Sequence, residues 1–210
     1  MIPNHVIKKS QQRMDPYQTE GFVLGKGSST PKIMLIGEAP GRNEVERGEP
    51  FIGRAGDKLD DFLTLAGLSR EEIYITSVVR SRPYHIREKT NQDGTITRKT
   101  PNRAPNKKEM LAHAPLLDYQ IQHLQPDIIV TLGNVALKRL LGDSYKITEV
   151  HGELLYQPIY YLQDDKDTTY TKTEQSYSIY PTFHPASVFY RQVLQETIEK
   201  DFTNLRHLLS

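Results

Sequence analysis

Four short apolar runs, separated by long stretches of a different character, constrain the fold of this chain more than any other feature. They are residues Ile33–Ile36, Ile73–Val79, Ile128–Leu132 and Tyr177–Thr182, and each has the length and composition of a buried strand. Parallel strands require crossover connections, and helical periodicity fills the intervals between these runs. The pattern therefore predicts an α/β protein, a three-layer α/β/α sandwich around a central, mainly parallel sheet of four strands.

The intervening segments repeat their apolar residues at the three- and four-residue spacing of an amphipathic helix. One helix is expected from about Gly56, another through Met110, and a short one after Gly133 that Gly142 ends. A last helix closes the chain. The apolar stripes consist of Leu59, Phe62, Leu63 and Ala66; Met110, Ala114, Leu117, Ile121 and Leu124; Val135, Leu137, Leu140 and Leu141; and Leu194, Ile198, Phe202, Leu205 and Leu209.

The length of the chain, 210 residues, suffices for one full core, so we expect a single domain over residues 1–210. Two polar stretches, residues 87–106 and 157–175, are longer than ordinary connections and are predicted to be loop insertions. The second is expected to form a hairpin around Pro158, because the short segments on either side of this proline have strand composition.

Membrane and disulfide chemistry are disfavoured by the composition. Residues 1–12 lack the apolar stretch of a signal peptide, and no apolar run reaches the length of about 18 residues that crosses a membrane. The chain has no cysteine, which excludes disulfides and thiolate-bound metals. We therefore expect a cytoplasmic protein without membrane contact.

Positive charge is concentrated in one segment. Residues 80–108 hold nine Lys or Arg and two acidic residues, a net charge of +7, whereas the whole chain carries +1. One interpretation is a solvated loop, because residues 91–94 have turn composition. The other is a surface for nucleic-acid phosphates, in which Arg80 and Arg82 are candidate contacts. The sequence leaves both interpretations open.

Glycine-rich and polar segments follow each predicted strand. They are Gly37-Glu38-Ala39-Pro40-Gly41, Ser77 with Arg80–Pro83, Gly133-Asn134, and Phe183-His184-Pro185-Ala186-Ser187. In an open parallel sheet, ligands bind in the crevice beyond the carboxyl ends of the strands. Glu38 and His184 are therefore expected to face one crevice.

These residues resemble the motifs of the uracil-DNA glycosylase superfamily. Gly37-Glu38-Ala39-Pro40-Gly41 with Pro50-Phe51-Ile52-Gly53-Arg54-Ala55-Gly56 is similar to the first motif in the form typical of family 4, and His184-Pro185-Ala186 is similar to the second. Residues 74–83, 102–105 and 131–133 resemble the family segments in between. The resemblance covers roughly residues 20–209, with the two polar stretches as insertions.

The resemblance implies hydrolysis of the C1′–N1 bond of deoxyuridine in DNA, which releases uracil and leaves an abasic site. It implies a flipped base that stacks on Phe51 in a pocket walled by Gly37 and Ala39. By the same analogy, His184 stabilises the negative charge of the departing base. The implied partner is uracil-containing DNA, single- or double-stranded, and the protein is expected to be a monomer.

A carboxylate is expected on the sugar side of the scissile bond, where it can orient water. Glu38 and Glu44 compete for this role, and Glu38 is preferred because it lies inside the motif directly after the strand. The alternatives are that Glu38 only accepts hydrogen bonds from the loop and that Glu44 is exposed. His151, which precedes Gly152, is a second candidate histidine at a loop that could touch DNA.

A missing cofactor is the first departure from the family. Family 4 enzymes that resemble this chain carry a four-iron, four-sulfur cluster on four cysteines, and Gln12, Asp15, Ser81 and His113 align with those positions here. These side chains cannot hold the cluster as a set, because its attachment to protein normally requires thiolates. We therefore predict no metal and no cofactor, with packing or hydrogen bonds holding this region.

The second departure is Ser77, which stands where family 4 usually places an asparagine against the Watson–Crick edge of uracil. A serine hydroxyl reaches less far than an amide. The pocket is therefore expected to accept uracil with the help of a water molecule, or another deaminated base such as hypoxanthine or xanthine. A third hypothesis, a non-catalytic nucleic-acid-binding protein of this fold, is disfavoured by the presence of Glu38, Phe51 and His184.

Bulky residues follow the second motif, where the family inserts an apolar wedge into the duplex. Val188, Phe189 and Tyr190 stand there, and Arg191 is a candidate phosphate contact. The alternative is that Val188 and Phe189 begin the core stripe of the last helix.

Overall fold

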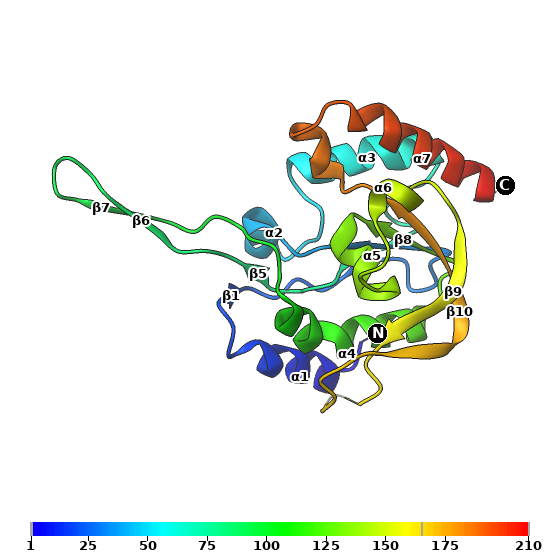
Figure 1. Ribbon diagram of the computed structural model, residues 1–210, viewed down its shortest axis with the longest axis horizontal. Helices are drawn as coiled ribbons and strands as arrows, with labels where there is room; N and C mark the ends of the chain where they lie inside the picture. The colour runs from blue at the N-terminus through cyan, green and yellow to red at the C-terminus, as the bar shows by residue number, and fades with distance from the viewer. Residues whose placement is uncertain (1, 165, 210) are drawn as a thin grey trace.

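A six-stranded sheet forms the centre of the molecule, with helices on both of its faces (Figure 1). This computed structural model describes residues 2–164 and 166–209. In spatial order the strands are β2 (Lys26–Gly27), β4 (Tyr74–Ser77), β3 (Ile33–Gly37), β8 (Ile128–Leu132), β10 (Thr171–Thr182) and β9 (Leu155–Tyr161). The predicted α/β architecture, with a mainly parallel sheet between helical layers, is confirmed.

The four strands predicted from apolar runs are the central four, β4, β3, β8 and β10, and they are parallel to one another. The predicted number of strands is wrong, because two edge strands join them in antiparallel orientation. One of them, β2, is only two residues long and carries no apolar side chain. The apolar pattern could therefore not have indicated it.

Alternate side chains of the central strands enter two separate cores, as the two-residue period of a strand requires. Ile33 and Leu35 pack on one face of the sheet, and Met34 and Ile36 pack on the other. The first face is covered by α3 (Arg54–Ala66) and α7 (Leu194–Leu209), and the second by α4 (Lys107–Leu124) and α5 (Asn134–Leu141). In Figure 1, α1 (Asn4–Met14) lies outside α4, against which it packs.

The second predicted insertion is a hairpin of a different form from the one expected. Residues on both sides of Pro158 belong to one strand, β9, and its partner is β10, which begins at Thr171 rather than at Tyr177. Pro158 has no N–H to donate to a ladder, but β9 is the outermost strand and has a neighbour on one side only. The proline is therefore compatible with a continuous edge strand.

The first predicted insertion also contains a hairpin, formed by β6 (Arg87–Thr90) and β7 (Ile96–Lys99), which extends far from the body of the molecule (Figure 1). At its root, β5 (Arg82–Pro83) pairs with β1 (Thr19–Glu20). Three short helical elements, α2 (Arg42–Arg47), α6 (Ile147–Val150) and the 3₁₀-helix η1 (Pro185–Phe189), occupy the loops around the ends of the central strands. None of the helices in the described part of the chain is long and apolar enough to cross a membrane.

Candidate active site

Residues from three strand ends meet beside the ring of Phe51. The rings of Phe51 and His184 are stacked, with centroids 5.5 Å apart and planes inclined by 29°. A Cβ atom on Gly37 would lie 2.6 Å from the Phe51 ring, so only glycine allows the ring this close to the strand end. A Cβ atom on Gly133 would lie 3.2 Å from that of His184. The two family motifs therefore share one site, as predicted.

Phe51 adopts an unusual backbone conformation that its surroundings hold in place. Its φ angle is +52°, in the left-handed region that residues other than glycine rarely occupy. The carbonyl oxygen of Phe51 accepts a 2.6 Å hydrogen bond from the guanidinium of Arg70, and its N–H donates to the carboxylate of Glu44. Phe51 is thus held by hydrogen bonds at both its N–H and its carbonyl group, and the residue is only 6% exposed.

Glu44 connects the two halves of the first motif. One of its carboxylate oxygens accepts a hydrogen bond from Gly41 N–H, and the other accepts one from Phe51 N–H. Burial raises the pKa of Glu44, and the hydrogen bonds from backbone N–H groups and the charge of Arg70 oppose that rise. Because both oxygens are engaged, the geometry favours a positioning role for Glu44 over the catalytic role predicted for it.

Glu38 lies directly after β3 and has a different environment. Its carboxylate has no hydrogen-bond or ion-pair partner among the described residues, while its backbone carbonyl accepts a hydrogen bond from Val79 N–H. Burial raises the pKa of Glu38 above the ordinary value of 4.5. Glu38 is therefore a half-buried carboxylate with free acceptor capacity, the property that a water-orienting group needs.

His184 is oriented by the backbone of its own motif. Its Nδ1 accepts a hydrogen bond of 3.1 Å from Ala186 N–H at the start of η1. In the neutral ring, the hydrogen is therefore carried by Nε2. Burial lowers the pKa of His184 to about 4, so the side chain is a neutral hydrogen-bond donor at physiological pH.

Ser77 lies beside Gly37, its partner in the β3–β4 register. It is buried, and its hydroxyl donates a 2.9 Å hydrogen bond to the carbonyl oxygen of Val79. Because the hydroxyl hydrogen is occupied, Ser77 has only acceptor capacity left for a ligand.

Comparison with known proteins agrees with this geometry. The family model described as "Uracil DNA glycosylase superfamily" matches residues 24–206. The chain belongs to this superfamily. It is 32% identical to the Type-4 uracil-DNA glycosylase of Sulfurisphaera tokodaii over 99% of this chain and 83% of that protein. The Type-4 uracil-DNA glycosylases of Saccharolobus solfataricus and Thermotoga maritima are each 34% identical, over 90% and 85% of this chain and 76% and 80% of their own lengths.

The residues after the second motif divide into a buried part and an exposed part. Val188 is 6% exposed and belongs to the core cluster under α3 and α7, so its predicted contact with DNA is wrong. The alternative holds only in part, because Val188 is a core residue but lies in η1, before the last helix begins at Leu194. Phe189 and Tyr190 are exposed, at 38% and 88%, and Arg191 is exposed as well. The guanidinium carbon of Arg54 lies 4.3 Å from the centre of the Phe189 ring. The apolar surface at this rim is therefore formed by Phe189 and Tyr190.

The predicted phosphate contacts at Arg80 and Arg82 are wrong for a physical reason: both side chains are buried. Arg80 donates to the side chain of Gln120, and burial lowers its pKa to about 10. Arg82 binds the side chains of Glu20 and Asn102 and a backbone carbonyl. The buried side chain of Arg80 therefore joins the loop after β4 to α4, and that of Arg82 stabilises the root of the β6–β7 hairpin.

His151 packs beside the second motif, against Phe183 and Asp201. Its Nδ1 is 3.0 Å from a carboxylate oxygen of Asp201, a buried residue that also accepts a 2.6 Å hydrogen bond from Thr182. The His151 ring lies 4.9 Å from that of Phe183, the residue before His184. This arrangement supports the second-motif loop, and a contact of His151 with DNA stays a prediction.

The positions aligned with cluster-binding cysteines do not suit an iron–sulfur cluster. Gln12 and Asp15 are exposed, whereas Ser81 and His113 are buried. The His113 ring packs 5.6 Å from that of Phe22, and burial holds its pKa well below its usual value. Within residues 2–164 and 166–209, no three His, Cys, Asp or Glu side chains form a group that could hold a metal ion. Because thiolates are lacking, the residues present do not fit a four-iron cluster.

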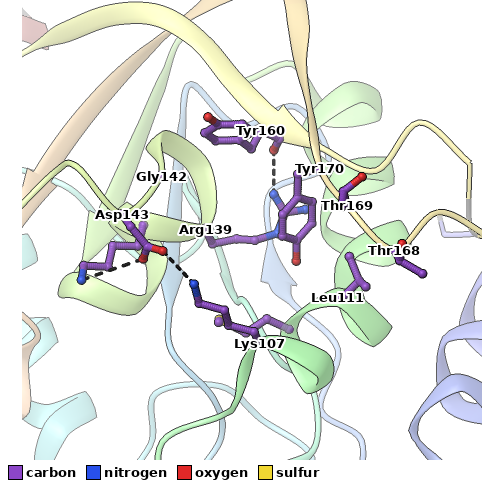
Figure 2. A pocket seen from close by; sticks show the side chains of 11 residues that line it. Lys107, Leu111, Arg139, Gly142, Asp143, Tyr160, Thr168, Thr169 and Tyr170 are labelled. Atoms are coloured by element: carbon purple, nitrogen blue, oxygen red, sulfur yellow. Dashed lines mark hydrogen bonds and ion pairs between the residues drawn. The ribbon is translucent and has the colours of Figure 1, made fainter.

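A separate pocket of about 370 Å³ lies between α4, α5 and the β9–β10 connection (Figure 2). Its charged side chains are paired internally: Arg139 binds the carboxylate of Asp118 and stacks against Tyr170 at 4.3 Å, and Lys107 lies 2.8 Å from Asp143. None of the residues of the two motifs lines this pocket. It is therefore distinct from the candidate active site.

Sequence reasoning did not identify Arg70, although its guanidinium fixes the carbonyl of Phe51. Arg70 lies beyond the end of α3, outside both motifs, and only the folded helix brings it back to this loop. Arg54 stands inside the first motif, so its position was a signal, but its stacking on Phe189 depends on the tertiary structure.

Replacement of Glu44 by alanine is expected to destabilise the protein as well as slow it, because the N–H groups of Gly41 and Phe51 lose their acceptor. Two unpaired, partly buried donors cost about 2 kcal/mol of unfolding free energy. The melting temperature should then fall by about 4–8 °C in a thermal unfolding experiment. Glu46→Ala, an exposed change on the same helix, is the control. A Glu44→Ala protein that melts with the parent but has lost turnover would contradict the positioning role.

Proposed function

We propose that this protein is a monofunctional uracil-DNA glycosylase, which hydrolyses the N-glycosidic bond between uracil and deoxyribose in DNA and leaves an abasic site. The observation that carries the proposal is the pairing of Phe51 with His184, in which an aromatic face and a fixed Nε2–H donor share one site. The names of the type-4 relatives support the same activity. The proposal includes a single-domain, monomeric protein that acts on DNA in the cytoplasm.

The base has to leave the stack before any of these groups can reach it. The ring of Phe51 offers the flipped uracil a flat apolar surface, and Gly37 and Ala39 form the adjoining backbone wall. His184 Nε2–H then donates a hydrogen bond to a carbonyl oxygen of the base. This donor stabilises the charge that develops as the bond breaks, in a site that largely excludes water.

In the bond-breaking step, the electron pair of the C1′–N1 bond leaves with the base, and positive charge develops on the sugar. The carboxylate of Glu38 stabilises that charge and accepts a proton from the water molecule whose oxygen adds to C1′. The uracil anion takes its proton from solvent. A neutral His184 suits this scheme, because the anion is stabilised without a proton transfer from the ring.

Ser77 accounts for selection against cytosine, although not against thymine, which carries the same N3–H donor as uracil. With its hydrogen donated to Val79, the hydroxyl oxygen can accept a hydrogen bond from the N3–H of uracil. Cytosine has an acceptor at N3 and would be rejected. Hypoxanthine and xanthine carry an N–H at the corresponding position, so the same observation supports a second candidate function, excision of these deaminated purines.

At the rim of the site, Phe189 and Tyr190 are placed to fill the gap that the flipped nucleotide leaves in the duplex. Their exposed rings offset part of the free energy lost on unstacking. Arg191 is placed to contact a phosphate beside them.

An excision assay tests the proposal. Labelled oligonucleotides that contain uracil, hypoxanthine, xanthine or thymine, as single strands and opposite each normal base, are incubated with the protein and treated with alkali. We expect alkali-labile sites at uracil and none at thymine. Cleavage at a deaminated purine alone would favour the second candidate, and binding without cleavage of any strand would establish the non-catalytic alternative instead.

A further inference from the structure

The β6–β7 hairpin presents exposed strands to solvent on both of its faces. Every residue of β6 and β7 is exposed, and the two strands pack mainly against each other, away from the body of the molecule (Figure 1). The ladder continues toward the body through the bridge between Tyr84 and Asn102. From Tyr84 to the turn at Asn91 the strand rises about 24 Å, at about 3.4 Å per residue. We call residues 84–102 the hairpin arm.

The register of the arm sorts its charges onto one face. Arg87 pairs with Lys99 and Lys89 pairs with Thr97, so these four side chains share a face. The three cations on this face have no hydrogen-bond or ion-pair partner in the described part of the chain. We call Arg87, Lys89 and Lys99 the cationic face.

The opposite face of the arm has a different chemistry. Its pairs are Glu88 with Arg98, whose charged groups lie 3.8 Å apart, and Thr90 with Ile96, which is 67% exposed. Positive charge on that face is compensated. The excess positive charge of the hairpin strands is therefore directed to one side.

The basic surface continues from the arm to the candidate active site. Arg42, the residue after Gly41 of the first motif, donates a 2.6 Å hydrogen bond to the hydroxyl of Thr100. Arg42, Arg87 and Lys99 line one pocket of about 520 Å³ between α2 and the root of the arm. A polyanion bound beside Arg42 would therefore also meet Arg87 and Lys99 of the cationic face.

We propose that the hairpin arm binds the phosphate backbone of the DNA duplex beside the flipped nucleotide. This inference rests on the proposed function for the identity of the ligand. The cationic face lacks the apolar and aromatic side chains that form the centre of a protein–protein interface, and a row of unpaired cations fits a row of phosphates. The length of the arm, about 24 Å, equals about seven base-pair steps of 3.4 Å.

The test is a triple variant, Arg87→Gln, Lys89→Gln and Lys99→Gln, and its binding to an undamaged duplex as a function of salt. Each phosphate contact contributes about 0.9 to the slope of log affinity against log salt, so the slope should fall by up to about 2.7. The affinity ratio of parent to variant should then rise about 40-fold as salt falls from about 200 mM to about 50 mM. With uracil-containing substrates, the triple variant should have a higher KM than the parent. This difference in KM should shrink when the duplex is too short to reach the arm.

A charge-matched control separates the arm from overall charge. Lys166→Gln, Lys172→Gln and Lys200→Gln remove three exposed cations outside the arm, and this protein should keep the parental salt slope. An unchanged slope in the arm variant, or an equal loss in the control, would overturn the inference. Because undamaged duplex is the ligand, the binding result does not depend on excision, so a failure of the proposed function is recognised separately in the excision assay.

Discussion

Replacement of His184 by alanine is expected to lower the single-turnover rate constant for uracil release by about 10²–10³-fold, the usual effect of removing one preorganised donor to a developing anion. The loss arises because Nε2–H, fixed by the Nδ1 contact with Ala186, is the donor beside the Phe51 ring. The measurement is rapid mixing of excess protein with a uracil-containing strand. Since this hydrogen bond gains most of its strength as negative charge develops on the base, the affinity for DNA should change less than the rate constant.

An exposed histidine provides the matched control. His123 stacks on Tyr119 at the end of α4, and His123→Ala should react at the parental rate. The pH dependence gives a second criterion: because burial lowers the pKa of His184 to about 4, the neutral donor is present at every pH above that value. A parental rate that titrates near pH 6.5, and loses this titration in His184→Ala, would contradict a neutral donor.

Replacement of Glu38 by glutamine is expected to lower the same rate constant by about 10²–10⁴-fold, because the amide cannot accept the proton of the attacking water. The change keeps the size of the side chain, so the melting temperature should stay close to that of the parent. The rate of the parent should fall as the pH drops through the pKa of Glu38, which burial places above the ordinary 4.5. The residual activity of Glu38→Gln should lack this acid limb.

Variants of two glutamates on α2 separate a loss of reaction rate from a loss of stability in that experiment. Glu46→Gln, on the exposed side of the helix, should resemble the parent in rate and stability. Glu44→Ala should lose stability together with rate, because its carboxylate binds the N–H groups of Gly41 and Phe51. A Glu38→Gln protein with the parental rate would assign the water-orienting role to another group.

The central sheet could be predicted from sequence because burial on both faces leaves strands that are almost continuously apolar, as in β3 and β8. The site was accessible because glycines and a histidine follow those strands at their carboxyl ends. Of the two edge strands, β2 was not accessible, because it carries no apolar side chain. β9 was recognised only as two short segments of strand composition, because Pro158 interrupts the pattern although an edge strand tolerates a proline.

Burial of polar groups could not be predicted from local sequence. Arg80 and Arg87 belong to the same basic segment, yet Arg80 is buried against Gln120 of α4 and Arg87 is exposed on the hairpin arm. The difference depends on a side chain forty positions away in the chain. The positive φ angle of Phe51 could not be predicted from local sequence either, because hydrogen bonds to Glu44 and to Arg70, which lies beyond α3, maintain it.

The buried Arg82 has a consequence for the thermodynamics of DNA binding. Its guanidinium binds Glu20, Asn102 and the carbonyl of Thr100, and so joins both strands of the arm's root to β1. A free loop of equal charge would lose much of its conformational entropy when it settled on DNA, at about 1–2 kcal/mol per ordered residue. An arm whose root is already ordered loses less, so more of the attraction to each phosphate remains as net affinity.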